Sequence, residues 1–297
     1  MKNQKFGIEI ELTGITRYIA AKEVAEFFKT KAEYFGGGYD EYHIKDDKER
    51  KWKIVSDSSI CSQKKEGNQI VAATNLYKVE LVSPILTYDD IETLQEIVRC
   101  FRKAGAIANR SCGIHIHIDG ANHTPISLKN LVNLIASKEE LLYKALEIDP
   151  LRLRYCKKVN EHLLSTINKK KPKTIEALAD IWYEGYGAET RRKHYHSSRY
   201  HGLNLHSIFD KGTVEFRLFN STTHAGKIKA YIQFCLAVSY QAINQKSASC
   251  KRTNTENEKY TFRCWMLRLG LIGKEFETCR QHFLAKLEGD SAWRHAA

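Results

Sequence analysis

The chain has 297 residues, of which 42% are hydrophobic and 28% are charged, as in a globular protein with a sizeable core. No apolar run approaches the length of a membrane-spanning helix and the N-terminus carries no signal-peptide pattern, so we expect a cytoplasmic protein without a membrane partner. The net charge of +12 indicates an anionic partner, which could be nucleic acid, nucleotide or an acidic substrate. None of the eight cysteines has C-x-x-C spacing, which is typical of reduced thiols.

The first element is a strand at residues 6–12, where hydrophobic and polar side chains alternate with a period of two. Phe6, Ile8 and Ile10 point to one face, while Glu9 and Glu11 point to the other. Carboxylates two residues apart on a strand lie roughly 6–7 Å from one another and repel, unless cations lie between or beside them. The strand therefore predicts one wall of a cation site.

The segments that follow predict mixed structure. Residues 20–32 have helical spacing, and the three glycines at 36–38 indicate a turn, because they lack the Gly-Lys-Ser/Thr of a phosphate-binding loop. Residues 52–60 read as a strand that ends in a polar turn, and 61–75 as a loop. A helix with an apolar stripe is predicted at 89–104.

Three later strands repeat the pattern of the first, with apolar side chains on one face and titratable ones on the other. Their polar faces carry Glu80, then His115, His117 and Asp119, then Glu215 and Arg217. Carboxylates and imidazoles hold divalent cations, and arginine holds phosphate. Four such strands in one chain predict a metal and phosphate site.

The second half of the chain is mostly helical in its pattern. We expect helices within 127–166, with Ser127 as N-cap and a break at Pro150, and at 174–183 and 224–244. A short strand is expected at 202–206, an exposed loop at 245–259, and one or two packing helices at 260–287. The basic stretch 191–201 is either an exposed loop or a flexible loop that brings cations over an anionic ligand.

Four carboxylates facing one cavity need counter-charge, and two or three Mg²⁺ or Mn²⁺ ions would provide it. An arginine two residues after a ligand glutamate can hold a phosphate with two hydrogen bonds. The combination favours metal-assisted phosphoryl transfer from a nucleotide. Each motif alone has a simpler alternative: Glu9 and Glu11 as an exposed polar face, or Glu215 and Arg217 as a surface ion pair.

Five motifs, taken in order, resemble the amidoligase family, whose relatives are glutamate–cysteine ligase and glutamine synthetase. The resemblance covers roughly residues 5–245. The motifs are Phe6-Gly7-Ile8-Glu9-Ile10-Glu11-Leu12, Trp52 with Asp57-Ser58-Ser59-Ile60, Glu80-Leu81-Val82-Ser83-Pro84, Gly113-Ile114-His115-Ile116-His117, and Val214-Glu215-Phe216-Arg217-Leu218-Phe219-Asn220.

The resemblance implies an α+β fold like that of glutamine synthetase, in which a curved, mainly antiparallel sheet lines a funnel and helices pack behind it. Residues 1–245 would form the catalytic domain, and 246–297 a helical extension packed on it. The implied activity is ATP-dependent ligation of a carboxylate to an amine through an acyl phosphate. The substrates would be small molecules or peptides, or a protein, and neither their identity nor the oligomeric state follows from the sequence.

The resemblance also implies roles for individual residues. Glu11 and Glu80 are similar to the ligands of one magnesium ion; a second ion would be held by Glu9, His115 and Glu215. His117 would lie near the nucleotide and Arg217 would stabilise the transferred phosphoryl group. Asn204 and Arg199 would lie near phosphate or substrate.

One departure concerns the turn at Asp57, where relatives commonly have Asp-Gly-Ser and this chain has Asp57-Ser58-Ser59. If that turn requires a positive φ, Ser58 is strained, and a site role for Asp57 is less secure. Two other functions stay open from the residues: a guanidino-type phosphotransferase, and a nucleic-acid-binding protein that uses the basic loop 191–201. The second is disfavoured, because no zinc-finger spacing or helix-turn-helix pattern is present.

Overall fold

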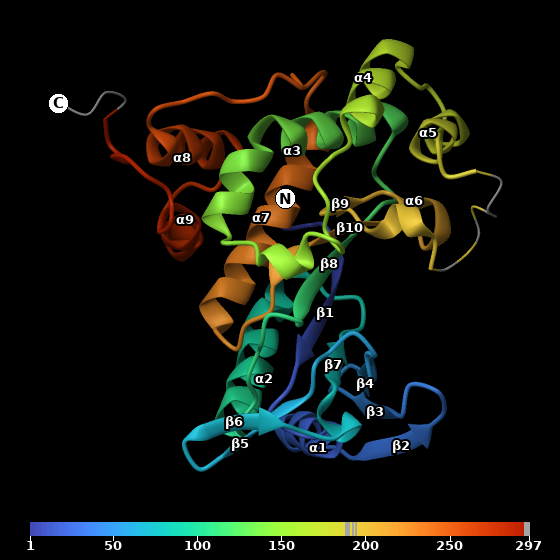
Figure 1. The fold of residues 1–297 in the computed structure, drawn as a ribbon, viewed down its shortest axis with the longest axis vertical. Coiled ribbons are helices and arrows are strands. Elements are labelled where there is room, and N and C mark those ends of the chain that lie inside the picture. The colour runs from blue at the N-terminus through green and yellow to red at the C-terminus, as the bar shows by residue number, and fades with distance from the viewer. Residues whose placement is uncertain (188–190, 192, 194, 294–297) are drawn as a thin grey trace. The chain divides into compact units, whose positions relative to one another are not determined.

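The structure is a computed structural model, which describes residues 1–187, 191, 193 and 195–293 (Figure 1). Its contacts divide the chain into two compact units. The strand-rich unit comprises residues 5–116 and 219–229, and the helix-rich unit comprises residues 1–4, 117–218 and 230–297. Strands β8 (Gly113–Asp119) and β10 (Thr213–Asn220) and helix α7 (Ala225–Asn244) each contribute residues to both units.

The strand-rich unit is built on a sheet with the order β2-β3-β4-β7-β1-β8. The pairs from β2 through to β1 are antiparallel. This order is linear, so the sheet is open and the fold is of the α+β class; the funnel of the glutamine synthetase fold stays a prediction. The strands are β1 (Phe6–Leu12), β2 (Ala32–Gly36), β3 (Glu41–Lys45), β4 (Lys51–Val55) and β7 (Val79–Val82).

The predicted alternation of β1 is confirmed, because Ile8, Ile10 and Leu12 are at most 1% exposed and form part of the core. Two helices belong to the same unit and pack against each other: α1 (Arg17–Phe28) and α2 (Ile91–Lys103). Two short 3₁₀ helices, η1 (Asn75–Tyr77) and η2 (Tyr88–Asp90), flank β7 in the chain.

Two hairpins in this unit contradict the sequence-based prediction. Helix α1 ends at Phe28 where Lys29 takes a left-handed conformation, and residues 32–45 then form the β2–β3 hairpin instead of a helix end and a loop. Residues 61–75 contain a second hairpin, β5 (Gln63–Glu66) with β6 (Gln69–Ala72), whose turn holds Gly67 at φ 58°. This hairpin was not predicted because β5 is mostly polar and lacks an apolar alternation, although Gly-Asn is a known hairpin signal.

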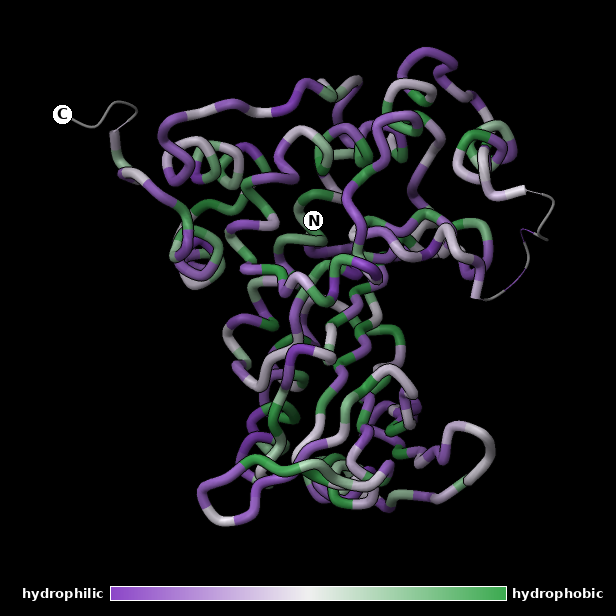
Figure 2. The backbone as a smooth tube through the Cα atoms, viewed as in Figure 1, coloured by the Kyte–Doolittle hydropathy of each residue, from purple (hydrophilic) through white to green (hydrophobic). Residues whose placement is uncertain are grey.

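The helix-rich unit contains the strand order β8-β10-β9, with β9 (Leu203–Asn204) antiparallel to β10. Its helices pack in pairs, among them α3 with α4, α4 with α5, and α8 with α9. Figure 2 shows hydrophobic and hydrophilic residues recurring along these helices, as amphipathic helices require. Besides α7, the elements are α3 (Pro125–Ala145), η3 (Pro150–Arg152), α4 (Glu161–Lys170), α5 (Ile175–Trp182), η4 (Ser197–Arg199), α6 (His206–Asp210), α8 (Glu258–Arg268), η5 (Lys274–Phe276) and α9 (Glu277–Leu284).

Some expected bounds in this unit are wrong. The N-cap of α3 is Thr124, and Ser127 is the third helical residue, whose hydroxyl accepts a hydrogen bond from the Thr124 N–H in a capping box. The strand expected at 202–206 is confined to β9, because His206 already begins α6. Two helices after residue 257 are confirmed; the domain boundary at 245 stays a prediction. None of the described helices combines the length and apolar composition that crossing a membrane requires.

Candidate active site

Within the strand-rich unit, the register of the sheet brings two glutamates together. Glu11 on β1 lies directly opposite Glu80 on β7 in the antiparallel pair. Glu11 is 5% exposed and Glu80 is half-buried. Like charges at directly opposite positions destabilise a sheet, so this pair requires counter-charge.

The imidazole of His115 on β8 lies beside two carboxylates of β1. Its Nδ1 is 3.0 Å from Glu9 Oε2, and its Nε2 is 3.8 Å from Glu11 Oε1. The backbone N–H of Gly113 donates to Glu11 Oε2 at 2.6 Å, which fixes that carboxylate. The two glutamates of β1 therefore share one face, as the alternation predicted.

These four residues, Glu9, Glu11, Glu80 and His115, form what we call the acidic cluster. One ligand atom from each of Glu11, Glu80 and His115 can be chosen so that all lie within 4.8 Å of one another. Carboxylate oxygens with a single imidazole suit hard divalent cations such as Mg²⁺ and Mn²⁺. The donor set fits such an ion.

A second group, the Glu215 cluster, lies in the helix-rich unit and consists of Asn204, Glu215, Arg217, His117 and Thr213. Asn204 on β9 pairs with Glu215 on β10, and its side-chain amide donates to Glu215 Oε2 at 2.7 Å. The amide orientation is fixed, because Asn204 Oδ1 accepts from the backbone N–H of His206 at 2.8 Å. Asn204 is thus a direct partner of Glu215.

Arg217 forms a buried ion pair with Glu215. The guanidinium Nη1 donates to Glu215 Oε1 at 2.5 Å, and the two side chains are only 6% and 5% exposed. The alternative of a surface ion pair is therefore wrong. A buried ion pair of this kind is weak evidence for a contribution to stability. It does hold the guanidinium of Arg217 in a fixed position inside the protein.

His117 is oriented by hydroxyl groups. Its Nδ1 is 3.1 Å from Thr213 Oγ1, which in turn is 2.8 Å from Ser207 Oγ. The other ring nitrogen, Nε2, lies 3.9 Å from Glu215 Oε1. The chain of hydroxyls holds the ring with Nε2 toward the carboxylate.

Arg199 ends the 3₁₀ helix η4 within the basic stretch. Its guanidinium carbon lies 5.1 Å from the ring centre of Tyr195 and 5.9 Å from that of Tyr200, which is cation–π distance. Arg192 and His194 of the same stretch lie outside the described residues. A role for Arg199 near phosphate stays a prediction.

The turn at Asp57 is an Asx turn, in which Asp57 Oδ1 accepts from the backbone N–H of Ser59 at 2.6 Å. Ser58 is not among the described residues with positive φ. The serine in place of glycine therefore brings no left-handed strain.

Sequence patterns missed several residues that support the Glu215 cluster. Arg152 is 4% exposed, and its guanidinium donates to the backbone carbonyl of Arg217 at 3.2 Å. Ser207 and Thr213 position His117, as described above. No sequence pattern indicated Arg152, because its role depends on a contact with Arg217, which lies 65 residues further along the chain.

A family model described as "Putative amidoligase enzyme" matches residues 2–239. The chain belongs to the amidoligase family. The match includes every residue of the acidic cluster and the Glu215 cluster, and it ends before α8 and α9. No curated protein sequence matched the chain. Membership of the amidoligase family indicates a ligase-type enzyme, and the acidic cluster is compatible with a bound metal ion.

Proposed function

We propose that this amidoligase is an ATP- and Mg²⁺-dependent (or Mn²⁺-dependent) ligase that joins a carboxylate to an amine through an acyl phosphate. The observation that carries the proposal is the pairing of Glu11 with Glu80 beside His115. Such a concentration of carboxylates calls for a divalent cation, and ATP-dependent enzymes use these ions to bind phosphate. The amide-forming class of reaction comes from the family.

In this proposal, Glu11, Glu80 and His115 hold one Mg²⁺ ion. The bound metal would neutralise charge on the ATP phosphates. A second ion, with Glu9, His115 and Glu215 as ligands, stays a prediction of the family resemblance.

The chain's own residues would then bind and orient the reactants. Arg217 is a buried guanidinium with a planar donor set that matches the oxygens of a phosphoryl group. The ion pair with Glu215 holds this guanidinium in place, and in the proposed reaction its positive charge would stabilise the charge that develops during transfer. His117 would contact the nucleotide, and Asn204 and Arg199 would contact phosphate or substrate.

The reaction has two steps. A carboxylate oxygen of one substrate attacks the γ-phosphorus of ATP, the bond from that phosphorus to the bridging oxygen breaks, and ADP leaves. The amine nitrogen of the second substrate then attacks the acyl carbon, loses a proton, and expels inorganic phosphate. One carboxylate oxygen therefore ends in the phosphate.

This oxygen transfer gives the test. Small-molecule and peptide carboxylates and amines would first be screened for ADP release that requires both partners. The active carboxylate would then be labelled with ¹⁸O, and the inorganic phosphate analysed by mass spectrometry. Labelled phosphate is the expected result, whereas unlabelled phosphate or a stable phosphorylated product would overturn the proposal; the second outcome would favour a guanidino-type kinase.

A variant pair tests the role of Arg217. We expect Arg217→Lys to lower the rate of ADP formation by a factor of 10² or more, because lysine cannot donate two parallel hydrogen bonds to a phosphoryl group. The matched control is Arg252→Lys, since Arg252 also pairs with carboxylates, Glu139 and Glu161, but lies outside the family match. Equal rates for the two variants would contradict the assignment.

A further inference from the structure

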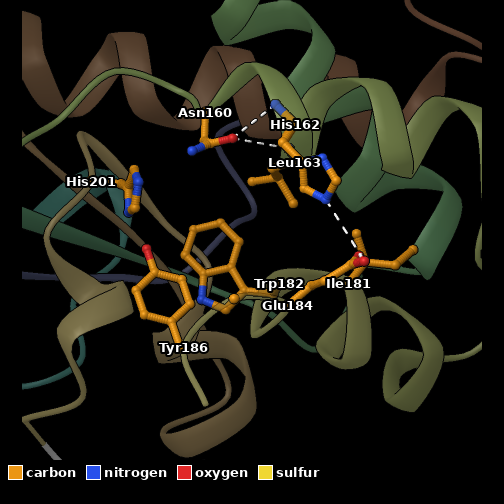
Figure 3. A pocket seen from close by; sticks show the side chains of 9 residues that line it. Asn160, His162, Leu163, Ile181, Trp182, Glu184, Tyr186 and His201 are labelled. Atoms are coloured by element: carbon orange, nitrogen blue, oxygen red, sulfur yellow. Dashed lines mark hydrogen bonds and ion pairs between the residues drawn. The ribbon is translucent and has the colours of Figure 1, made fainter.

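The helix-rich unit contains a cavity of about 290 Å³, which we call the Trp182 cavity (Figure 3). Its floor is buried and its rim is exposed, so it is open to solvent on one side. A volume at the low end of the range for ligand pockets fits a single ring system. Its lining residues are Asn160, His162, Leu163, Ile181, Trp182, Glu184, Gly185, Tyr186 and His201.

Aromatic rings form much of the wall. Figure 3 shows the rings of Trp182, Tyr186 and His201 around a common space. Trp182 and His201 meet edge to face, with ring centres 5.5 Å apart. The indole N–H of Trp182 donates to Ser198 Oγ at 3.0 Å, which fixes the ring. Fixed rings of this kind offer faces and edges for a further ring.

The polar groups inside the cavity, away from its exposed rim, include both a hydrogen-bond acceptor and a donor. The ring of His201 contacts the backbone carbonyl of Ser198 through Nδ1 at 3.0 Å, and burial lowers the pKa of His201, so the neutral form with Nδ1–H is favoured. Its Nε2 is then a hydrogen-bond acceptor. Burial raises the pKa of Tyr186, so its phenol stays protonated and can donate.

Asn160 adds a donor at the rim. Its Oδ1 is occupied as the N-cap of α4, where it accepts from the backbone N–H groups of His162 at 2.8 Å and Leu163 at 3.2 Å. The side-chain nitrogen keeps its two N–H donors for a ligand. His162 and Glu184 lie exposed at the rim, where His162 Nε2 is 3.7 Å from Glu184 Oε1.

We propose that the Trp182 cavity binds a neutral, planar heteroaromatic ring whose edge carries both hydrogen-bond donors and acceptors. His201 stands three residues before Asn204, so their Cα atoms are at most about 11 Å apart. Asn204 contacts Glu215, and the ring would therefore belong to a molecule that also reaches the Glu215 cluster. Two sources share this chemistry: the base of the nucleotide, which rests on the proposed function, and a ring on a substrate.

The test measures ring binding without phosphate or metal. Adenosine and L-histidine would be titrated separately by calorimetry at pH 8 in EDTA, with ribose as a compound that lacks the ring; a neutral imidazole carries one hydrogen-bond donor and one acceptor. We expect one of the two ring compounds to bind and ribose not to bind. Adenosine binding identifies the nucleotide base as the ring, and binding of L-histidine alone identifies a substrate ring.

Two variants locate the binding. Tyr186→Leu removes a ring of the wall, and Asn160→Asp keeps the helix cap but replaces the N–H donors by a carboxylate. We expect each to weaken binding at least tenfold, while Tyr240→Leu, at an exposed tyrosine of α7, leaves it unchanged. Thermal unfolding of each variant confirms that it is folded.

Two outcomes would overturn the inference: binding of neither ring compound, or binding that both cavity variants leave unchanged. Failure of the ligase proposal gives a different result. Glu11→Gln would then leave Mg²⁺-dependent ATP binding unaltered, or no such binding would exist, while ring binding in EDTA would persist.

Discussion

Replacing Glu80 by glutamine tests the acidic cluster most directly. Glutamine has nearly the same shape as glutamate, so Glu80→Gln removes the charge and keeps the size of the side chain. The charge lies opposite Glu11, with ligand atoms of the two side chains within 4.8 Å. Without a metal ion, the variant should therefore be more stable than the wild type.

The size of the effect follows from Coulomb's law. Two like charges 4.8 Å apart repel by about 3 kcal/mol at an effective dielectric constant of about 20. Because Glu80 is half-buried, solvent weakens the repulsion, and we expect a gain of about 1–3 kcal/mol in the free energy of unfolding. With a divalent ion the order of stability of the two proteins reverses. At an ion concentration of a hundred times the dissociation constant, binding stabilises the wild type by about 2.7 kcal/mol and the variant by much less.

The assay is thermal and urea unfolding at pH 8, in EDTA and in a series of MgCl₂ and MnCl₂ concentrations. The control is Glu33→Gln, at an exposed glutamate of strand β2. A loss of stability in EDTA for Glu80→Gln, or metal stabilisation equal to that of the wild type, would refute the reasoning.

Three further predictions concern stability. A Cβ at Gly120 would lie 2.5 Å from the carbonyl oxygen of Gly212, so Gly120→Ala should lower the free energy of unfolding by about 1–3 kcal/mol in urea titrations, whereas Gly38→Ala, which meets open space, should change it little. Burial raises the pKa of Glu139 to about 7, so the stability that its protonation provides is present below pH 4.5 and lost as pH rises through 7. Over that range the free energy of unfolding of Glu139→Gln should rise by up to about 3 kcal/mol relative to that of the wild type. Burial lowers the pKa of His123 to about 4, so the stability that neutral His123 provides is present above pH 6.5 and lost as pH falls through 4. The wild type should lose about 3 kcal/mol over this range, and His123→Gln should not show this loss. A variant whose stability follows the same pH profile as the wild type would contradict the assignment for Glu139 or His123.

The sequence was a good guide to the faces of strands and a poor guide to their partners. Alternation with a period of two placed Glu9 and Glu11 on one face, and their contacts with His115 confirm this. The opposition of Glu11 and Glu80 depends on register, which joins residues far apart in the chain. Periodicity carries no information about register, since any even shift preserves the same faces.

Local sequence signals for the ends of helices were unreliable where the same residues could belong to more than one element. Residues 32–45 form a hairpin because Lys29 ends α1 early in a left-handed conformation, and a lysine is not a usual residue for that role. At the start of α3 the sequence offers two suitable N-cap residues, Thr124 and Ser127. Only the geometry of the capping box shows that Thr124 is the N-cap. The elements with strong apolar stripes, such as α2, were predicted within two residues.

The acidic cluster and the Glu215 cluster differ in how their negative charge is offset, and this difference predicts which of them binds a metal ion more strongly. Glu215 has a guanidinium from its own strand and an amide from the next strand. The acidic cluster instead gathers three carboxylates around a single imidazole. A cation entering the Glu215 cluster would compete with Arg217, whereas a cation entering the acidic cluster would relieve repulsion. Metal affinity should therefore depend more on Glu11 and Glu80 than on Glu215, and substitutions at Glu215 should act mainly through the position of Arg217.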